Sequence, residues 1–300
     1  MHRRQTSLTK TTASRGVSSG TLVLVVAVDL LVVALITWLF RTEVFTPVVD
    51  ATAGLVNRTL LGNALPLALV VGLLIVRLGD LRARDIGLVW SRIPLGITVT
   101  ASIWLLVQGI QAVSAQLLNG TVEPAAKWSE WGITPVLGAL IGQLLGNALY
   151  EELVYRGFLF AQILLQLRRR WPTSAYRPLV AASLTSQALF AARHIPSALA
   201  EGMPAIDMAL DLLRLIVLGI LLALLYVRTA NLFIVIGVHT LMNAPTALFS
   251  SVIIDASVLV ILLAILLLCL WPGRKKRVNP NGPAEHVTPG PRREAPPRKS

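Results

Sequence analysis

Eight long apolar stretches constrain the fold of this chain more than any other feature. A helix needs about 20 predominantly apolar residues to cross a bilayer core about 30 Å thick. The stretches are continuous and lack the alternating pattern of barrel strands. The sequence therefore predicts an all-α fold, a polytopic transmembrane helical bundle of about eight spans. The expected spans lie at about 21–40, 60–78, 93–118, 134–167, 178–195, 207–227, 231–250 and 252–271.

Basic residues are concentrated in alternate connections of the chain. Cytoplasmic connections of membrane proteins carry an excess of Lys and Arg. The connections at 41–59, 119–133 and 196–206 have no such excess. We therefore expect both termini to be cytoplasmic. The basic groups follow spans two, four, six and eight: Arg77, Arg82, Arg84 and Arg92; Arg168 to Arg170 with Arg177; Arg228; and Arg274 to Arg277.

The net charge of +12 comes mainly from the two ends of the chain. Residues 1–20 carry four basic groups and no acid, and residues 272–300 carry eight basic groups and two acids. This distribution favours a membrane partner, with attraction to anionic headgroups, and argues against nucleic acid. We expect five regions in the chain: a basic cytoplasmic tail (1–20), N-terminal transmembrane helices (21–133), a core of further helices (134–250), a last transmembrane helix (251–271) and a disordered, basic, proline-rich cytoplasmic tail (272–300).

The fourth apolar stretch is too long for one simple span. At 1.5 Å per residue it predicts either a steeply tilted helix or a span followed by an interfacial helix that ends near Arg168. It contains Gly138, Gly142 and Gly146, spaced four apart on one helix face. Such a stripe allows a neighbouring helix to approach closely, although glycine is also simply frequent in membrane helices.

Ionisable and polar side chains occur within the spans as three short motifs. The motifs read EELVYR at 151–156, FAARH at 190–194 and HTLMN at 239–243. A charge at mid-bilayer costs about 2.5 kcal/mol or more, so such groups usually face the bundle interior. We expect their polar side chains to line one wet cavity. Glu152 and Arg156 are four apart and can form an ion pair on one helix face.

These residue types support more than one chemistry. A buried carboxylate beside an imidazole can remove a proton from water, as Glu151 could with His194. His239 and Asn243, one helical turn apart, could stabilise an oxyanion. Equally, Glu151 with the two histidines is a plausible zinc ligand set with water in the fourth position. The single Cys269 excludes an intramolecular disulfide and a cysteine-rich zinc site.

The three motifs, in this order, resemble those of the CPBP membrane endopeptidases. That family includes the type II CAAX prenyl proteases and the Abi-like bacteriocin-processing and immunity proteins. The resemblance implies that Glu151 activates water with His194, and that His239 with Asn243 stabilises the oxyanion. It also implies a supporting ion pair between Glu152 and Arg156. The family has been described both as metal-dependent, which would make zinc the cofactor, and as metal-free.

The resulting hypothesis is an intramembrane endopeptidase that cleaves a membrane-associated peptide or protein. We expect a multi-pass integral protein of a bacterial plasma membrane. A literal prenylated substrate is not expected, and the sequence predicts neither the cleavage site nor the oligomeric state. Two alternatives remain open. One is an ion- or proton-coupled transporter, and the other is a non-catalytic immunity or scaffold protein.

Five further residues in or near the spans lie outside these roles. Phe190 is expected to serve packing, and Asp211 with Arg214 to form a local pair. Arg193 points away from His194 and is expected to reach the interface or meet an acid. No role is predicted for Asp29.

Overall fold

The computed structural model describes residues 15–174, 176–251 and 253–272. Helices account for most of this part of the chain, and its β-pairing is confined to an isolated bridge between Pro124 and Phe249. The predicted all-α class is confirmed. The helices are α1 (Ser19–Leu39), α2 (Thr46–Ala51), α3 (Arg58–Pro66), η2 (Leu67–Leu78), η3 (Ala83–Ile86), η4 (Trp90–Arg92), α4 (Ile93–Asn119), α5 (Lys127–Glu130), α6 (Ile133–Ile141), η5 (Gly142–Asn147), α7 (Ala148–Glu151), η6 (Glu152–Phe160), α8 (Ala161–Arg170), α9 (Arg177–Ala192), α10 (Ile195–Ala200), α11 (Ala205–Thr229), α12 (Leu232–Asn243) and α13 (Ala256–Leu270).

Each of the eight expected apolar stretches contains a helix. Among the described residues, five continuous helices are long and apolar enough to cross a membrane. The helices α9, α12 and α13 are shorter, so the number of spans stays a prediction. Most of the predicted tails, at 1–14 and 273–300, lies outside the described residues. The five long helices are Ser19–Leu39, Arg58–Leu78, Trp90–Asn119, Ile133–Arg170 and Ala205–Thr229.

The fourth stretch forms one continuous helix from Ile133 to Arg170. At 1.5 Å per residue its 38 residues extend about 57 Å, nearly twice the thickness of a bilayer core. Two sections, η5 and η6, have the wider π-helical winding, which is frequent at functional sites. These sections flank α7, which ends at Glu151.

The seventh stretch is helical only as far as Asn243, although the sequence predicts a span to residue 250. Pro245 explains the early end, because a proline disfavours helical geometry in the residue before it. The chain then runs back along the connection before α5, where the Ala125 N–H donates to the Leu248 carbonyl at 2.9 Å. Asp255 caps the next helix by accepting from the Ser257 N–H at 2.7 Å.

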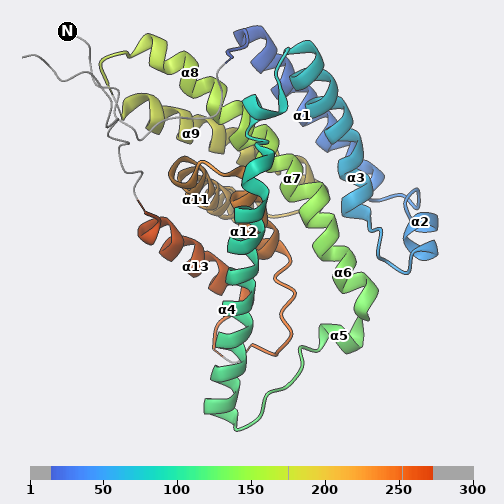
Figure 1. Cartoon of the computed structure of the whole chain (residues 1–300). Coiled ribbons are helices and arrows are strands. Elements are labelled where there is room, and N and C mark those ends of the chain that lie inside the picture. Colours follow the sequence, from blue (N-terminus) through green and yellow to red (C-terminus); the bar gives the residue numbers. More distant parts are fainter. Residues whose placement is uncertain (1–14, 175, 252, 273–300) are drawn as a thin grey trace, which may run out of the picture.

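The centre of the bundle is formed by η6 and α12. All nine residues of η6 are buried, as are residues 232–242 of α12 apart from Phe233. Around α12 pack α4, α11, α13 and the middle of the long helix. Helices α1 and α3 pack against each other beside this centre, and α3 also contacts η5. Figure 1 shows α1 and α3 on the side of α7 away from α11 and α13.

Contacts between the connections agree with the prediction that the basic connections lie on the same side of the bundle. Arg15 pairs with Asp80 at 2.8 Å, which brings the start of α1 to the end of η2. Arg92 donates to the carbonyl of Ala230, and Arg228 donates to the carbonyl of Trp271 at 2.6 Å. These connections therefore lie at one end of the bundle. The cytoplasmic orientation of that end stays a prediction.

The glycine stripe is a site of close backbone packing. A side chain at Gly138 would meet the carbonyl of Gly54, and one at Gly142 would meet the side chain of Asn57. The Asn57 amide donates to the Gly138 carbonyl at 2.9 Å. A Cβ at Gly146 would lie 3.2 Å from the carbonyl oxygen of Thr59. The stripe therefore lets the chain from residue 54 into α3 approach the long helix, as one of the two interpretations predicted.

A substitution within this stripe should weaken the packing of α3. We expect Gly142→Ala to lower the free energy of unfolding by about 1–3 kcal/mol, the usual cost of overpacking. Gly109→Ala on α4 is the matched control, because nothing lies within 4 Å of its added methyl group. Thermal unfolding of both variants in detergent tests this expectation. Equal unfolding temperatures for the two variants would contradict it.

Candidate active site

The structure brings Glu151, His194 and His239 together from three separate segments of the chain. Glu151 is the last residue of α7, His194 follows α9, and His239 lies in α12. The Oε1 atom of Glu151 is 3.8 Å from Nε2 of His194, and its Oε2 atom is 3.5 Å from Nε2 of His239. Glu151 and His239 are buried, whereas 27% of the His194 side chain is exposed. Both imidazoles therefore face one carboxylate.

Hydrogen bonds to the other ring nitrogens fix the orientation of both histidines. Nδ1 of His194 lies 2.9 Å from the carbonyl oxygen of Phe190, and Nδ1 of His239 lies 2.7 Å from Oε1 of Glu152. These oxygens only accept, so each Nδ1 carries a proton and donates it. In a neutral ring, Nε2 is then the atom with the free lone pair. Each histidine thus presents Nε2 toward Glu151.

Glu152 and Arg156 form a fully buried ion pair. Nη1 of Arg156 lies 2.9 Å from Oε1 of Glu152, and both side chains have no exposed surface. The other terminal nitrogen of Arg156 donates to the carbonyl of Gly219 at 3.4 Å. Since Oε1 of Glu152 also accepts from His239, the pair connects η6 to α12. It supports the position of one of the two histidines.

Phe190 is the common neighbour of the residues around Glu151. Its ring makes edge-to-face contacts with the rings of Tyr155 and His194, at centroid distances of 5.3 and 5.0 Å. The His239 ring lies 6.4 Å away in a similar geometry. The Arg156 guanidinium lies 4.5 Å from the Phe190 centroid. Phe190 therefore packs the site, as the sequence indicated.

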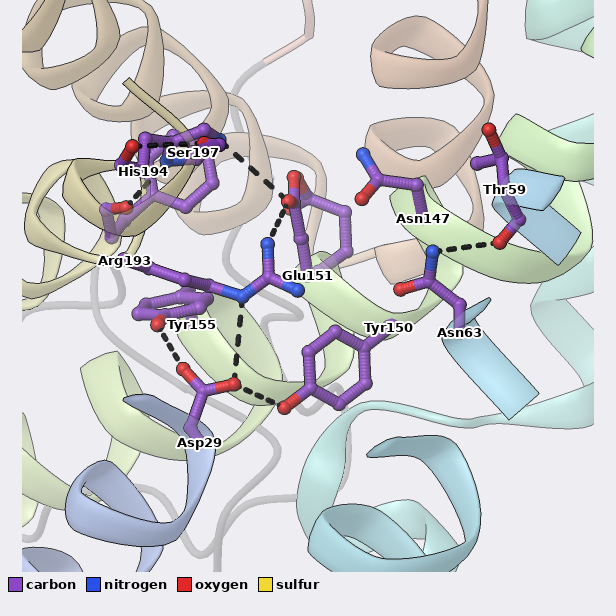
Figure 2. Close-up of polar contacts among 12 residues, drawn as sticks. Asp29, Thr59, Asn63, Asn147, Tyr150, Glu151, Tyr155, Arg193, His194 and Ser197 are labelled. Atoms are coloured by element: carbon purple, nitrogen blue, oxygen red, sulfur yellow. Dashed lines mark hydrogen bonds and ion pairs between the residues drawn. The ribbon is translucent and has the colours of Figure 1, made fainter. Parts of the chain in front are cut away.

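Arg193 and Asp29 complete the surroundings of Glu151. Arg193 meets an acid, as one of its two expected roles predicted, but it converges with His194 on the same oxygen of Glu151 instead of pointing away from it. No role was predicted for Asp29. Arg193 donates to Oε1 of Glu151 at 2.6 Å, and its Nε lies 3.5 Å from Asp29. The hydroxyl groups of Tyr150 and Tyr155 donate to the two carboxylate oxygens of Asp29 (Figure 2). Sequence spacing gave no sign of this network, because Asp29 lies in α1, more than 100 residues from its partners.

A cavity of about 460 Å³ opens beside Glu151. Its wall contains Glu151, Arg193 and His194, together with side chains from α1, α3 and α10. Of the polar motif residues predicted to line one cavity, only Glu151 and His194 lie in this wall, whereas Glu152, Arg156, His239 and Asn243 do not. Helices outside the three motifs build part of it. The polar residues in its wall, apart from these three, are Thr37, Arg41, Thr59, Asn63, Gln143, Asn147, Ser197 and Glu201.

Asn243 does not line this cavity but is hydrogen-bonded to Gln143, which does. Its amide nitrogen donates to Oε1 of Gln143 at 3.0 Å, and Asn147 donates to the same oxygen at 3.4 Å. Gln143 and Asn147 both lie in the cavity wall. They precede Glu151 by eight and four residues, so helical spacing could have placed them on its face.

The zinc alternative requires Glu151, His194 and His239 to converge on one point. Within the part of the chain that the structure describes, no three His, Cys, Asp or Glu side chains form a group that could hold a metal ion. The Arg193 guanidinium also occupies one oxygen of Glu151 at 2.6 Å. The side chains as placed do not fit a zinc site, and the mechanism below uses no metal.

Comparison with known families identifies the central part of the chain. Residues 131–245 match the family model for type II CAAX prenyl endopeptidases, Rce1-like. This segment contains all three motifs, so the family that they indicated is confirmed, and the segment belongs to it. No curated protein and no solved structure matches the chain. With its long apolar helices, the chain is an integral, multi-pass membrane protein related to membrane proteases.

Removing one partner of the buried ion pair should destabilise the protein strongly. Arg156→Met leaves Glu152 without its buried counter-charge, a change that typically costs about 3–5 kcal/mol. Arg214→Met removes a comparable i,i+3 pair with Asp211, but that arginine side chain is 63% exposed. Its loss should change stability by less than about 1 kcal/mol. Denaturant unfolding in detergent measures both, and similar losses for the two variants would refute the expectation.

Proposed function

We propose that the chain is an intramembrane endopeptidase that hydrolyses a peptide bond of a membrane-associated peptide or protein. The observation that carries this proposal is the pair formed by Oε1 of Glu151 and Nε2 of His194. These two acceptors lie 3.8 Å apart in the wall of the cavity. A water molecule has two hydrogens to donate and can bond both acceptors at once. The pair is therefore suited to hold and activate a water molecule.

The proposed reaction uses Glu151 first as a base and then as an acid. The carboxylate takes one proton from the water while the water oxygen attacks the substrate carbonyl carbon. This gives a tetrahedral intermediate with a negative oxygen. The proton then passes to the amide nitrogen, the carbon–nitrogen bond breaks, and the carboxyl and amino products leave. His194 orients the water through its Nε2.

His239 and Asn243 are proposed to stabilise the oxyanion. Asn243 donates its remaining amide N–H. His239 donates from Nε2 in the form of the ring that carries a proton on both nitrogens, because its Nδ1 proton is already donated to Glu152. Preorganised N–H donors at the position of the developing charge are among the strongest catalytic contributions. Asn243 holds the oxygen of Gln143, so the N–H groups of Gln143 are left as donors for the cavity that it lines. We propose that Gln143 shares the oxyanion-stabilising role with His239 and Asn243.

The proposed partners are the lipid bilayer and a peptide or protein substrate, in the plasma membrane of a bacterium. The alternatives of a transporter and a non-catalytic binding protein share the buried charges but need no activated water. They are separated from the peptidase by the effect of a substitution at Glu151.

Replacing the proposed base should abolish cleavage. Glu151→Gln keeps the shape of the side chain but removes its basicity, so the rate should fall by at least about 100-fold. The measurement is cleavage of lipid-anchored, quenched-fluorescent peptides in proteoliposomes, with Arg214→Gln as a control of unchanged activity. Retained cleavage in a folded Glu151→Gln protein would refute the mechanism. If the wild type cleaves none of the peptides but still protects or binds a partner, the non-catalytic immunity or scaffold protein would be favoured.

Removal of divalent metals should leave the activity in place. Every proposed step uses side chains of the chain itself, so dialysis against a strong chelator should change the cleavage rate less than twofold, a difference of under about 0.5 kcal/mol in barrier height. Metal content of the purified protein is measured in parallel. Loss of activity that zinc restores would instead overturn the metal-free mechanism.

A further inference from the structure

We infer that Arg193 is a positioning residue for the Glu151 carboxylate, and that Asp29 of α1 holds Arg193 in place. This inference rests on the proposed function, because it assumes that Glu151 is the base. It concerns two residues outside the roles assigned to the three motifs. Asp29 also lies outside the segment that matches the endopeptidase family.

Arg193 contacts the oxygen of Glu151 that also faces His194. Its Nη1 atom donates to Oε1 at 2.6 Å, and Nε2 of His194 lies 3.8 Å from the same Oε1. A carboxylate at the end of a side chain turns easily about its last bond unless a directional hydrogen bond restrains it. The guanidinium provides that bond. It thereby fixes the edge of Glu151 that is proposed to meet the water.

Asp29 secures the opposite side of the Arg193 guanidinium. One carboxylate oxygen of Asp29 lies 3.5 Å from Nε of Arg193, and the hydroxyls of Tyr150 and Tyr155 donate to its two oxygens. The Tyr150 ring lies 5.1 Å from the guanidinium carbon and limits its movement on another side. Arg193 is therefore held between two acids and one aromatic ring, as Figure 2 shows.

Burial gives this arrangement its rigidity. Asp29 and Glu151 are 2% and 1% exposed, and Arg193 is 7% exposed. Water cannot replace a lost partner easily at such positions, so each charged group depends on the others. Arginine also keeps its charge and offers several donors in a fixed plane. A positioning role for Arg193 therefore makes α1 a functional part of the active site.

The test is a double-mutant cycle on the proteoliposome cleavage assay. We expect Arg193→Gln to lower kcat by roughly 10- to 100-fold with little change in KM, because a small misplacement of a reacting group is costly. Arg193→Lys keeps the charge and should recover part of the loss. Asp29→Asn should lower kcat less than Arg193→Gln. The double variant should be no slower than Arg193→Gln alone, since Asp29 acts through Arg193.

Other outcomes identify which proposal has failed. Unchanged kcat in folded Arg193→Gln, losses that multiply in the double variant, or an effect on KM alone would overturn the positioning role. If Glu151→Gln is inactive and Arg193→Gln is fully active, only the positioning role is wrong. If Glu151→Gln remains active, the proposed mechanism itself is wrong.

Controls separate positioning from folding. Rates are expressed per folded protein, measured by thermal unfolding in detergent, and Arg214→Gln serves as the arginine control on an exposed ion pair. Should Arg193→Gln fail to fold, the cycle is run with Arg193→Lys and Asp29→Asn. A double variant slower than both single variants by the product of their losses would then overturn the inference.

Discussion

The burial of five charged side chains in an apolar bundle controls the arrangement of the whole centre. Asp29, Glu151, Glu152, Arg156 and Arg193 are all less than one tenth exposed. Charges at such depth are tolerated only when they are paired and hydrogen-bonded. Helices α1, α7 and η6 and the end of α9 therefore meet where each charge lies beside an opposite one. The neighbouring histidines enter the same network through the two glutamates.

This network joins two parts of the chain that sequence comparison separates. The endopeptidase segment, 131–245, contains the three motifs. The cavity beside Glu151 is nevertheless walled partly by α1 and α3, which precede that segment. The close approach of α3 depends on the small surface of the glycine stripe in the long helix. The N-terminal helices, predicted as membrane spans, are thus also part of the structure of the site.

Local sequence signals predicted many individual elements. The apolar stretches located the helices, and the four-residue spacing of Glu152 and Arg156 predicted a contact that the structure shows at 2.9 Å. The same reasoning extended the seventh helix too far, because hydropathy outweighed the effect of Pro245. Hydropathy measures the preference for lipid, whereas the end of a helix depends on backbone geometry.

The sequence by itself determined the helical class, the approximate positions of the helices and the residue types available for chemistry. These properties follow from local composition and from spacing along one helix. Tertiary structure alone decided that Asp29 and Arg193 belong beside Glu151, and that Asn243 contacts Gln143. The partners in these contacts lie on different helices, and no periodicity within one helix specifies which face of another it will meet. Mutual satisfaction of buried charges and close packing made that selection.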